Sequence, residues 1–452
     1  MRRLLYEARR AASSPNRNAR SATVFGRLLG AAFVICLLTG LYSHFLQEPL
    51  DGMRFPTSPV WLYQVSQGIH ITAGIACIPL LLAKLHSVFP QLFQHPPIKH
   101  PVDVLERASI ALFVAATILQ LVTGLLNTYQ YYPWPFPFKQ VHFALSFVII
   151  GSLAVHIAVK LPLITRYWRA RDSYDAEGRF VEPSAELDEA RAAFVGETEA
   201  TAELARFRAV RDADGTRRDR DPHAAPPAPA RGLTGRVTRW IDSAHEVDRE
   251  PGRARVSRRG FFTAAGVATG GVVALTAGQS FAPLSPLNAF APRQRGLGPN
   301  DLPINRTAAA AQVLETAMDP DWRLDVVVGG VATSFTLDTL RGFDGADERL
   351  PIACVEGWSQ TGAWRGVRLV DLLAAAGAPT DHRLRLTSLE KKGGYRVTEM
   401  GPEYASDPRT LVALELNGEP LSIDHGYPAR MIAPGRPGVL QTKWLSSIEV
   451  LS

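Results

Sequence analysis

Long apolar runs alternate with short polar segments through the first third of the chain. Four of these runs hold roughly 20 apolar residues each, enough to cross about 30 Å of hydrocarbon as α-helices. They lie at residues 28–46, 65–85, 108–126 and 142–164. The pattern predicts an all-α, four-helix membrane bundle over residues 28–165.

A charged stretch follows the predicted bundle. Residues 166–256 are rich in Arg, Asp, Glu, Ala and Pro. This composition favours a mostly disordered linker, because such a segment buries too little apolar surface to fold. A short helix at residues 185–210 is one option within it.

A fifth apolar run lies at residues 257–282. It combines Ser257-Arg258-Arg259-Gly260-Phe261-Phe262 with a Gly/Ala-rich core that is only weakly hydrophobic. This combination resembles a twin-arginine export signal placed inside the chain; the alternative is a basic flank before an ordinary fifth membrane helix. We find no convincing small-x-small cleavage site here, so we expect the run to remain as a transmembrane helix.

The pattern changes again after a Pro-rich neck at residues 283–299. Short β-branched runs separated by Gly, Pro and Asp predict strands, and one amphipathic run predicts a helix. The expected strands lie at 324–328, 383–387, 411–416 and 448–451, with a turn at Asn417-Gly418, and the helix lies at 369–376. We therefore expect an α+β domain over residues 300–452, large enough for its own core.

The distribution of charged residues indicates how these segments are oriented across the membrane. The net charge of +6 is modest, and the arginines gather before and between apolar runs, so no nucleic-acid partner is expected. The arm at residues 1–27 is rich in arginine and holds one acid, Glu7. The positive-inside rule therefore places the N-terminus in the cytoplasm of a bacterial cell. Four crossings return the linker to the cytoplasm, and the fifth carries the C-terminal domain to the outer face, with the twin-arginine and Sec machineries as export partners.

The chain has three cysteines. Cys36 and Cys77 lie in apolar runs, where a thiol is most often a small packing residue. This leaves Cys354 without an obvious partner and excludes a disulfide scaffold. Cys354 is therefore either a buried structural residue or a reactive or metal-bound one.

Histidines inside the apolar runs are costly to bury and usually functional. His142 and His156 are 14 residues apart on the fourth run, which corresponds to about 21 Å and nearly the same helix face. Because the second and fourth runs cross in the same direction, His70 lies at the level of His142 and can pair with it. Two imidazoles on facing helices are what bis-histidine haem ligation requires.

The inner level of the bundle is less well defined. His86 is the candidate partner of His156, although its 16-residue separation from His70 rotates it by about 160° on an ideal helix. His44, at the outer end of the first run, is a competing ligand. The alternative for all these histidines is hydrogen bonding within the bundle or at the membrane interface.

The spacing of His142 and His156 resembles the four-helix cytochrome b of bacterial respiratory enzymes, in which the fourth helix supplies two haem ligands. In several such subunits the first helix provides the other ligand of the inner haem, but His44 lies at the wrong end for that role. The resemblance implies haem b, one or two per chain, and electron exchange with quinone among the membrane lipids.

A second resemblance surrounds Cys354. The run Ile352-Ala353-Cys354-Val355-Glu356-Gly357-Trp358-Ser359, with Trp364-Arg365-Gly366 and Leu372-Leu373 downstream, is similar to the molybdenum-binding segment of the sulfite oxidase family. The Cys-Val-Glu-aromatic order is closest to the periplasmic methionine sulfoxide reductases of that family, since arginines follow the cysteine in sulfite oxidases proper. Closing motifs at 416–421, 424–430 and 443–448 match the family in order.

This resemblance implies a molybdenum–molybdopterin cofactor. A thiolate is a soft ligand suited to molybdenum, which gives that role to Cys354, beside the two sulfurs of the pterin dithiolene. Charged donors to the pterin phosphate are expected, with a solvated surface charge as the alternative for each basic residue. The implied donors are His425, Arg430 and Lys443, with Asn305, Arg306 and Thr307 at the start of the domain.

Two further residues are expected on the substrate side of the metal, Glu356 and Trp358, with Trp364 beside them. Glu356 is either a proton donor for oxygen-atom transfer or a carboxylate that pairs with a nearby arginine such as Arg365.

Together these features predict a multi-domain, membrane-bound molybdenum oxidoreductase that exchanges electrons with haem b and quinone. Reduction of a small sulfoxide-type substrate on the outer face is favoured, because the segment lacks basic residues that would attract sulfite; sulfite oxidation is the alternative. A metal-free binding domain on a membrane cytochrome is the alternative of another class. Five spans without paired broken helices disfavour a transporter.

Overall fold

The computed structural model describes residues 16–90, 101–169 and 258–451. The linker predicted at 166–256 lies almost wholly outside these ranges, as do the short helix at 185–210, most of the basic arm and Ser257 of the export motif. The chain divides into two compact units, which are described separately. One comprises Met1–Gly30, Ile78–Leu119 and Ala144–Ala268, and the other comprises Ala31–Cys77, Gln120–Phe143 and Thr269–Ser452.

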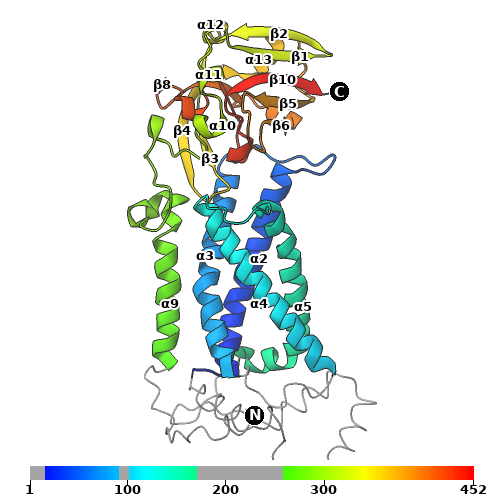
Figure 1. The fold of residues 1–452 in the computed structure, drawn as a ribbon, viewed down its shortest axis with the longest axis vertical. Coiled ribbons are helices and arrows are strands. Elements are labelled where there is room, and N and C mark those ends of the chain that lie inside the picture. The colour runs from blue at the N-terminus through cyan, green and yellow to red at the C-terminus, as the bar shows by residue number, and fades with distance from the viewer. Residues whose placement is uncertain (1–15, 91–100, 170–257, 452) are drawn as a thin grey trace, which may run out of the picture. The chain divides into compact units, whose positions relative to one another are not determined.

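Five helices of the described chain are long and apolar enough to cross a membrane (Figure 1). They are α2 (Ala19–Gln47), α3 (Leu62–Val88), α4 (Pro101–Thr128), α5 (Phe138–Arg169) and α9 (Arg258–Ala274). The first four contain the four predicted runs and extend past them at both ends, because backbone hydrogen bonding continues into the flanking polar residues. The apolar pattern therefore located each helix core but not its ends.

The first unit holds Phe261 and Phe262, the aromatic pair of the predicted export motif. The ring of Phe262 stacks on Phe25 of α2 at a centroid distance of 5.0 Å, and Phe261 meets the same ring edge-on at 5.5 Å. Both phenylalanines thus pack against the first helix, and α9 begins as part of this unit.

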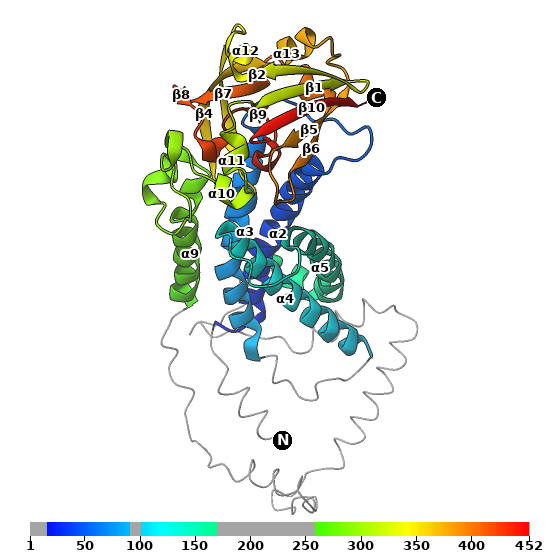
Figure 2. The same ribbon diagram turned by 45° about the horizontal axis from the view of Figure 1, so that its top comes forward.

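The C-terminal part of the second unit contains two five-stranded sheets (Figures 1 and 2). The first has the order β2-β1-β10-β5-β6, and the second the order β3-β4-β7-β8 with β9 paired to β7. The strands are β1 (Arg323–Val328), β2 (Val331–Thr336), β3 (Ala346–Ala353), β4 (Ser359–Arg368), β5 (Arg383–Ser388), β6 (Val397–Met400), β7 (Leu411–Leu416), β8 (Glu419–Pro420), β9 (Arg430–Ile432) and β10 (Leu445–Leu451). All pairs are antiparallel except β1 with β10.

Short helices complete this region. They are α10 (Ala308–Ala311), α11 (Leu314–Ala317), α12 (Leu337–Arg341), α13 (Leu369–Ala375) and α14 (Pro402–Ala405). The predicted strands correspond to β1, β5, β7 and β10, the predicted amphipathic helix is α13, and Asn417 and Gly418 both have positive φ at the turn after β7. The expected fold class, an all-α helical part followed by an α+β domain, is confirmed.

Two apolar clusters form the core of the sheet region. One includes Leu324, Leu386 and Ile448 of the first sheet and Val412 of the second. The other surrounds the β3–β4 hairpin and includes Cys354, Trp358 and Trp364. The second cluster holds the hairpin loop rigidly and so positions the residues discussed next.

Candidate metal centres

The β3–β4 hairpin presents Cys354 at its tip. Ala353 pairs with Ser359 as the last rung of the ladder. The loop between them is closed by a hydrogen bond from the Cys354 amide to the Trp358 carbonyl at 2.9 Å and one from the Gly357 amide to the Cys354 carbonyl at 3.0 Å. Cys354 is fully buried, and burial raises the pKa of its thiol well above the usual value. A thiol in such a place becomes a thiolate when a metal ion replaces its proton.

Glu356 of the same loop is nearly buried and is held by amide and indole donors. The Gln130 side chain donates to its carboxylate at 2.5 Å, and the Trp358 indole donates at 3.4 Å. Arg293 in turn donates to the Gln130 side-chain oxygen at 2.6 Å. Burial raises the pKa of Glu356. The alternative partner, Arg365, instead forms an exposed ion pair with Asp347 on the neighbouring strand.

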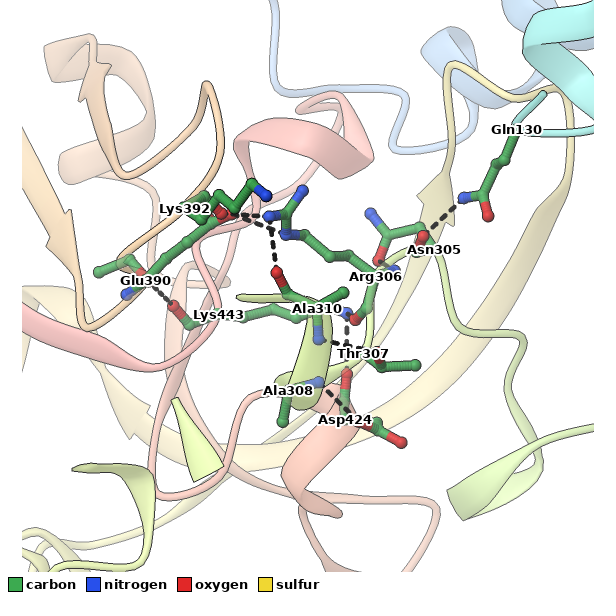
Figure 3. Close-up of polar contacts among 11 residues, drawn as sticks. Gln130, Asn305, Arg306, Thr307, Ala308, Ala310, Glu390, Lys392, Asp424 and Lys443 are labelled. Carbon is green, nitrogen blue, oxygen red and sulfur yellow. Dashed lines mark hydrogen bonds and ion pairs between the residues drawn. The ribbon is translucent and has the colours of Figure 1, made fainter. Parts of the chain in front are cut away.

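Three buried cationic or potentially cationic side chains, Lys443, Arg430 and His425, lie among the carbonyl groups of the same domain. Lys443 donates to the carbonyls of Arg306 and Asp424 at 2.9 and 2.8 Å (Figure 3). Arg430 donates to the His425 carbonyl at 3.2 Å and lies over the Trp364 ring. Among the described residues, neither Lys443 nor Arg430 forms an ion pair with a carboxylate.

Burial disfavours the charged forms of the three residues in this cation cluster, Lys443, Arg430 and His425. Burial lowers the pKa of Arg430 to about 9 and that of Lys443 well below its usual value, and it lowers the pKa of His425 to about 3. The Arg430 Nε and the His425 Nδ1 are buried without a hydrogen-bond partner. Unpaired buried charges and donors are strongly destabilising, so this cluster fits an anionic group such as a pterin phosphate.

The residues at the start of the domain have mixed environments. The Asn305 carbonyl accepts from Gln130 at 2.6 Å (Figure 3). Arg306 is half exposed, forms an ion pair with Glu390 at 2.8 Å and donates to backbone carbonyls. Thr307 caps α10 by accepting from the Ala310 amide at 3.2 Å. The side chains of Arg306 and Thr307 thus already have protein partners, whereas the Arg430 Nε and the His425 Nδ1 have none.

The two histidines predicted to pair in one haem site, called the outer pair from here on, are His70 on α3 and His142 on α5, and they meet within the second unit. Their ring centroids lie 6.2 Å apart. A metal held at about 2 Å from one nitrogen of each ring separates the centroids by about 6 Å, so this pair fits an iron between them. The Nδ1 atom of His70 lies 3.0 Å from the Cys36 carbonyl and 3.1 Å from the Thr39 hydroxyl, which orients the ring as in metal-bound histidines.

Small residues line the outer pair. A Cβ atom added to Gly40 would lie 3.1 Å from the His70 ring, and one added to Gly124 would lie 3.3 Å from the His142 ring. Glycine at these two helix positions leaves room beside both imidazoles.

The other candidate haem ligands have different surroundings. His156 faces the Phe113 ring at 6.3 Å, and its Nδ1 atom is buried without a hydrogen-bond partner. His86 lies near Arg17, at 3.4 Å from its Nε, and near the Phe261 ring at 4.9 Å. His44 stacks on Phe143 at 3.7 Å and lies 3.9 Å from Glu48.

The described residues contain no cluster of three or more His, Cys, Asp or Glu side chains arranged to hold a metal ion. Three residues that the sequence did not single out, Gln130, Gln67 and Asn127, donate to the Cys354 loop, and Arg293 donates to Gln130. As single polar residues near helix ends, they give no periodic signal.

Known families match both parts of the chain. Residues 310–452 match the oxidoreductase molybdopterin binding domain, and residues 21–162 match prokaryotic cytochrome b561. The chain therefore joins a molybdopterin-binding oxidoreductase domain to a cytochrome b561-type membrane domain. The fusion predicted from sequence is confirmed at this level, as is its pairing of molybdopterin with haem b.

Individual relatives cover smaller parts. Mitochondrial sulfite oxidase of Rattus norvegicus is 34% identical to this chain over 168 residues, which cover 30% of each protein. Mitochondrial sulfite oxidase of Homo sapiens is 32% identical over 162 residues, which cover 29% of this chain and 30% of the human protein. The NADH nitrate reductase of Spinacia oleracea is 40% identical over 100 residues, 20% of this chain and 11% of its own. The chain thus spans less than a third of these relatives. The crystal structure of sulfane dehydrogenase SoxCD from Paracoccus pantotrophus matches at 24% identity over 29% of this chain and 38% of that one, with a TM-score of 0.27.

Proposed function

We propose that this protein is a membrane-bound enzyme that passes electrons from quinol through haem b to molybdenum, where a small sulfoxide is reduced. The observation that carries the proposal is the buried Cys354 thiol in the same domain as a cation cluster without carboxylate partners. When bound, the molybdenum cofactor supplies two-electron oxygen-atom transfer, and haem supplies single electrons.

Each of the candidate site residues has a distinct proposed role. Cys354 holds the metal, and Arg430, His425 and Lys443 bind the anionic end of the pterin, with Asn305, Arg306 and Thr307 at its edge. Burial raises the pKa of Glu356 against the opposing effect of its donors Gln130 and Trp358, so this side chain holds a proton and delivers it to the oxygen that leaves as water. Trp358 covers the substrate side and keeps bulk water away. His70 and His142 hold one haem iron.

The orientation in the membrane is part of the proposal. The arginine-rich arm and the 166–256 linker lie in the cytoplasm, and the molybdenum domain lies on the outer face of a bacterial membrane. Arg258 and Arg259 direct that domain through the twin-arginine route, and α9 remains as a fifth span. Replacing both arginines with lysine should retain the domain in the cytoplasm, as measured by protease protection in spheroplasts; normal export of that variant would refute the signal.

The first experiment is elemental analysis for molybdenum on detergent-extracted protein, wild type beside Cys354→Ala, with haem spectra from the same samples. About one molybdenum per chain in the wild type, lost in the variant while the haem bands persist, supports the enzyme. Haem without molybdenum in properly exported wild-type protein refutes it and leaves a cytochrome that carries a binding domain.

Sulfite oxidation is the second candidate, favoured by the identity to sulfite oxidases. The haem spectrum separates the two directions. A sulfoxide such as methionine sulfoxide should oxidise pre-reduced haem, whereas sulfite should reduce oxidised haem. Because Cys354 is followed by Val355 and Glu356 rather than by arginines, we expect the sulfoxide response, and rapid haem reduction by sulfite would reverse the assignment.

A further inference from the structure

The α3 helix carries His70 between two residues that contact the Cys354 loop. Gln67, one turn earlier, donates to the Val355 carbonyl at 3.4 Å. Ile71, the next residue after His70, has side-chain carbons 3.1 and 3.2 Å from where a Cβ atom would stand on Gly357. One turn of one helix therefore touches both proposed centres, and all these residues belong to the same compact unit.

Gly357 is the contact point of the loop. It adopts a φ of +100°, a conformation that side chains other than glycine rarely adopt. A Cβ atom at this position would also approach the Gln279 side-chain nitrogen at 3.3 Å. The Gly357 carbonyl accepts from the Ser280 hydroxyl. Glycine is thus required both by the turn and by the close approach of Ile71 and the segment after α9.

Further contacts fix the loop on the helix ends. Asn127 of α4 donates to the Val355 carbonyl at 3.4 Å, and Gln130 donates to the Glu356 carboxylate. Tyr63 at the start of α3 is buried in a cluster with Leu46 and Ala353. These contacts hold the Cys354 loop against the ends of α3 and α4.

We propose that the Ile71–Gly357 contact is the electron path between the haem held by His70 and the metal held by Cys354. His70 and Ile71 are joined by a peptide bond. The Ile71 side chain lies so near Gly357 that a Cβ atom there would be 3.1 Å from it, and the Gly357 amide donates to the Cys354 carbonyl at 3.0 Å. This inference rests on the proposed function.

The electron count of the proposed reaction fits this path. Reduction of one sulfoxide consumes two electrons and two protons, breaks the sulfur–oxygen bond and releases one water. Each oxidation of ferrous to ferric haem supplies one electron, so the path is used twice per substrate. One quinol supplies both electrons and releases two protons.

Two isoleucines flank His70 and make a matched pair for the test. Ile71 contacts the loop, whereas Ile69 is 39% exposed on the helix surface. We would compare Ile71→Ala with Ile69→Ala in the full chain by stopped-flow, following reoxidation of pre-reduced haem after addition of methionine sulfoxide. In parallel, reduced viologen would supply electrons to the molybdenum site directly.

Ile71→Ala should slow haem reoxidation several-fold while molybdenum content, haem content and viologen-driven turnover stay at the wild-type level; Ile69→Ala should change none of these. Wild-type reoxidation in Ile71→Ala would overturn the path, and so would an equal loss of viologen-driven turnover, because Ile71 would then support the site rather than the transfer. Absence of viologen-driven turnover in the wild type would instead refute the proposed function.

A cofactor-independent readout tests the docking itself. In a Cys354→Ala background, the pair Gln67→Cys and Val355→Cys should form a disulfide under mild oxidation, detected by mass spectrometry of the joined peptides. The pair Ile69→Cys and Val355→Cys should not. Failure of the first pair to join, or equal joining of both, would show that the loop does not rest on the His70 turn.

Discussion

The outer and inner histidines of the helical domain show what a spacing pattern can and cannot specify. The outer pair, His70 and His142, has its rings 6.2 Å apart, with Cys36 and Thr39 orienting one of them. The inner candidates instead have separate neighbours: His156 faces Phe113, and His86 contacts Arg17 and Phe261. A ligand position on a helix becomes a site only when its partner and its supporting hydrogen bonds are also in place.

The largest expected effect is the loss of the outer site. His142→Ala should remove the haem held with His70, because a single remaining imidazole cannot clamp the iron from both sides, and substrate-driven haem oxidation should fall to background. His86→Ala should leave the oxidation in place. Both variants are checked by measuring the haem content per chain and the stopped-flow absorbance. An equal loss of haem in the two variants would contradict the assignment of His142, and not His86, to the haem site that oxidises on addition of substrate.

A smaller, partial effect is expected from His156. Its buried Nδ1 lacks a hydrogen-bond partner, which is costly for a purely structural histidine. We expect His156→Ala to remove part of the haem absorbance and one component of the redox titration, while the His70–His142 component stays. An unchanged titration would indicate a single haem per chain.

The sequence predicted the parts of these sites that depend on periodicity, namely the helix cores, the strands β1, β5, β7 and β10, and the pairing of His70 with His142. Cys354 was predictable from its neighbours in the chain. The contacts of Gln130, Gln67 and Ile71 with the Cys354 loop were not, because they join segments more than 200 residues apart and each rests on a single side chain. Side-chain partners such as Glu390 for Arg306 likewise depend on the folded arrangement.

A third prediction concerns the hydrogen bonds that orient the outer pair. Thr39→Val removes the hydroxyl 3.1 Å from His70 but leaves the Cys36 carbonyl, so we expect haem affinity to fall by about tenfold, at the lower end of the range for such supporting groups. Thr128→Val on α4 is the matched control, since that hydroxyl bonds only to its own helix at Leu125. Haem titration of the apoprotein measures both, and similar affinities would show that the Cys36 carbonyl alone orients the ring.

The smallest effect comes from a buried histidine of the sheet domain, His425, which like His156 has an Nδ1 atom without a partner. Burial lowers the pKa of His425 to about 3 in the folded chain. The unfolded chain takes up a proton below about pH 6.5, whereas the folded chain stays neutral until about pH 3, so the free energy of unfolding decreases as the pH falls through this window. In the cofactor-free Cys354→Ala protein, His425→Gln should therefore lose less stability than its parent between about pH 7 and pH 5, by about 2 kcal/mol. Thermal unfolding of both proteins at the two pH values measures the difference, and parallel decreases would show that His425 is not the buried neutral group responsible.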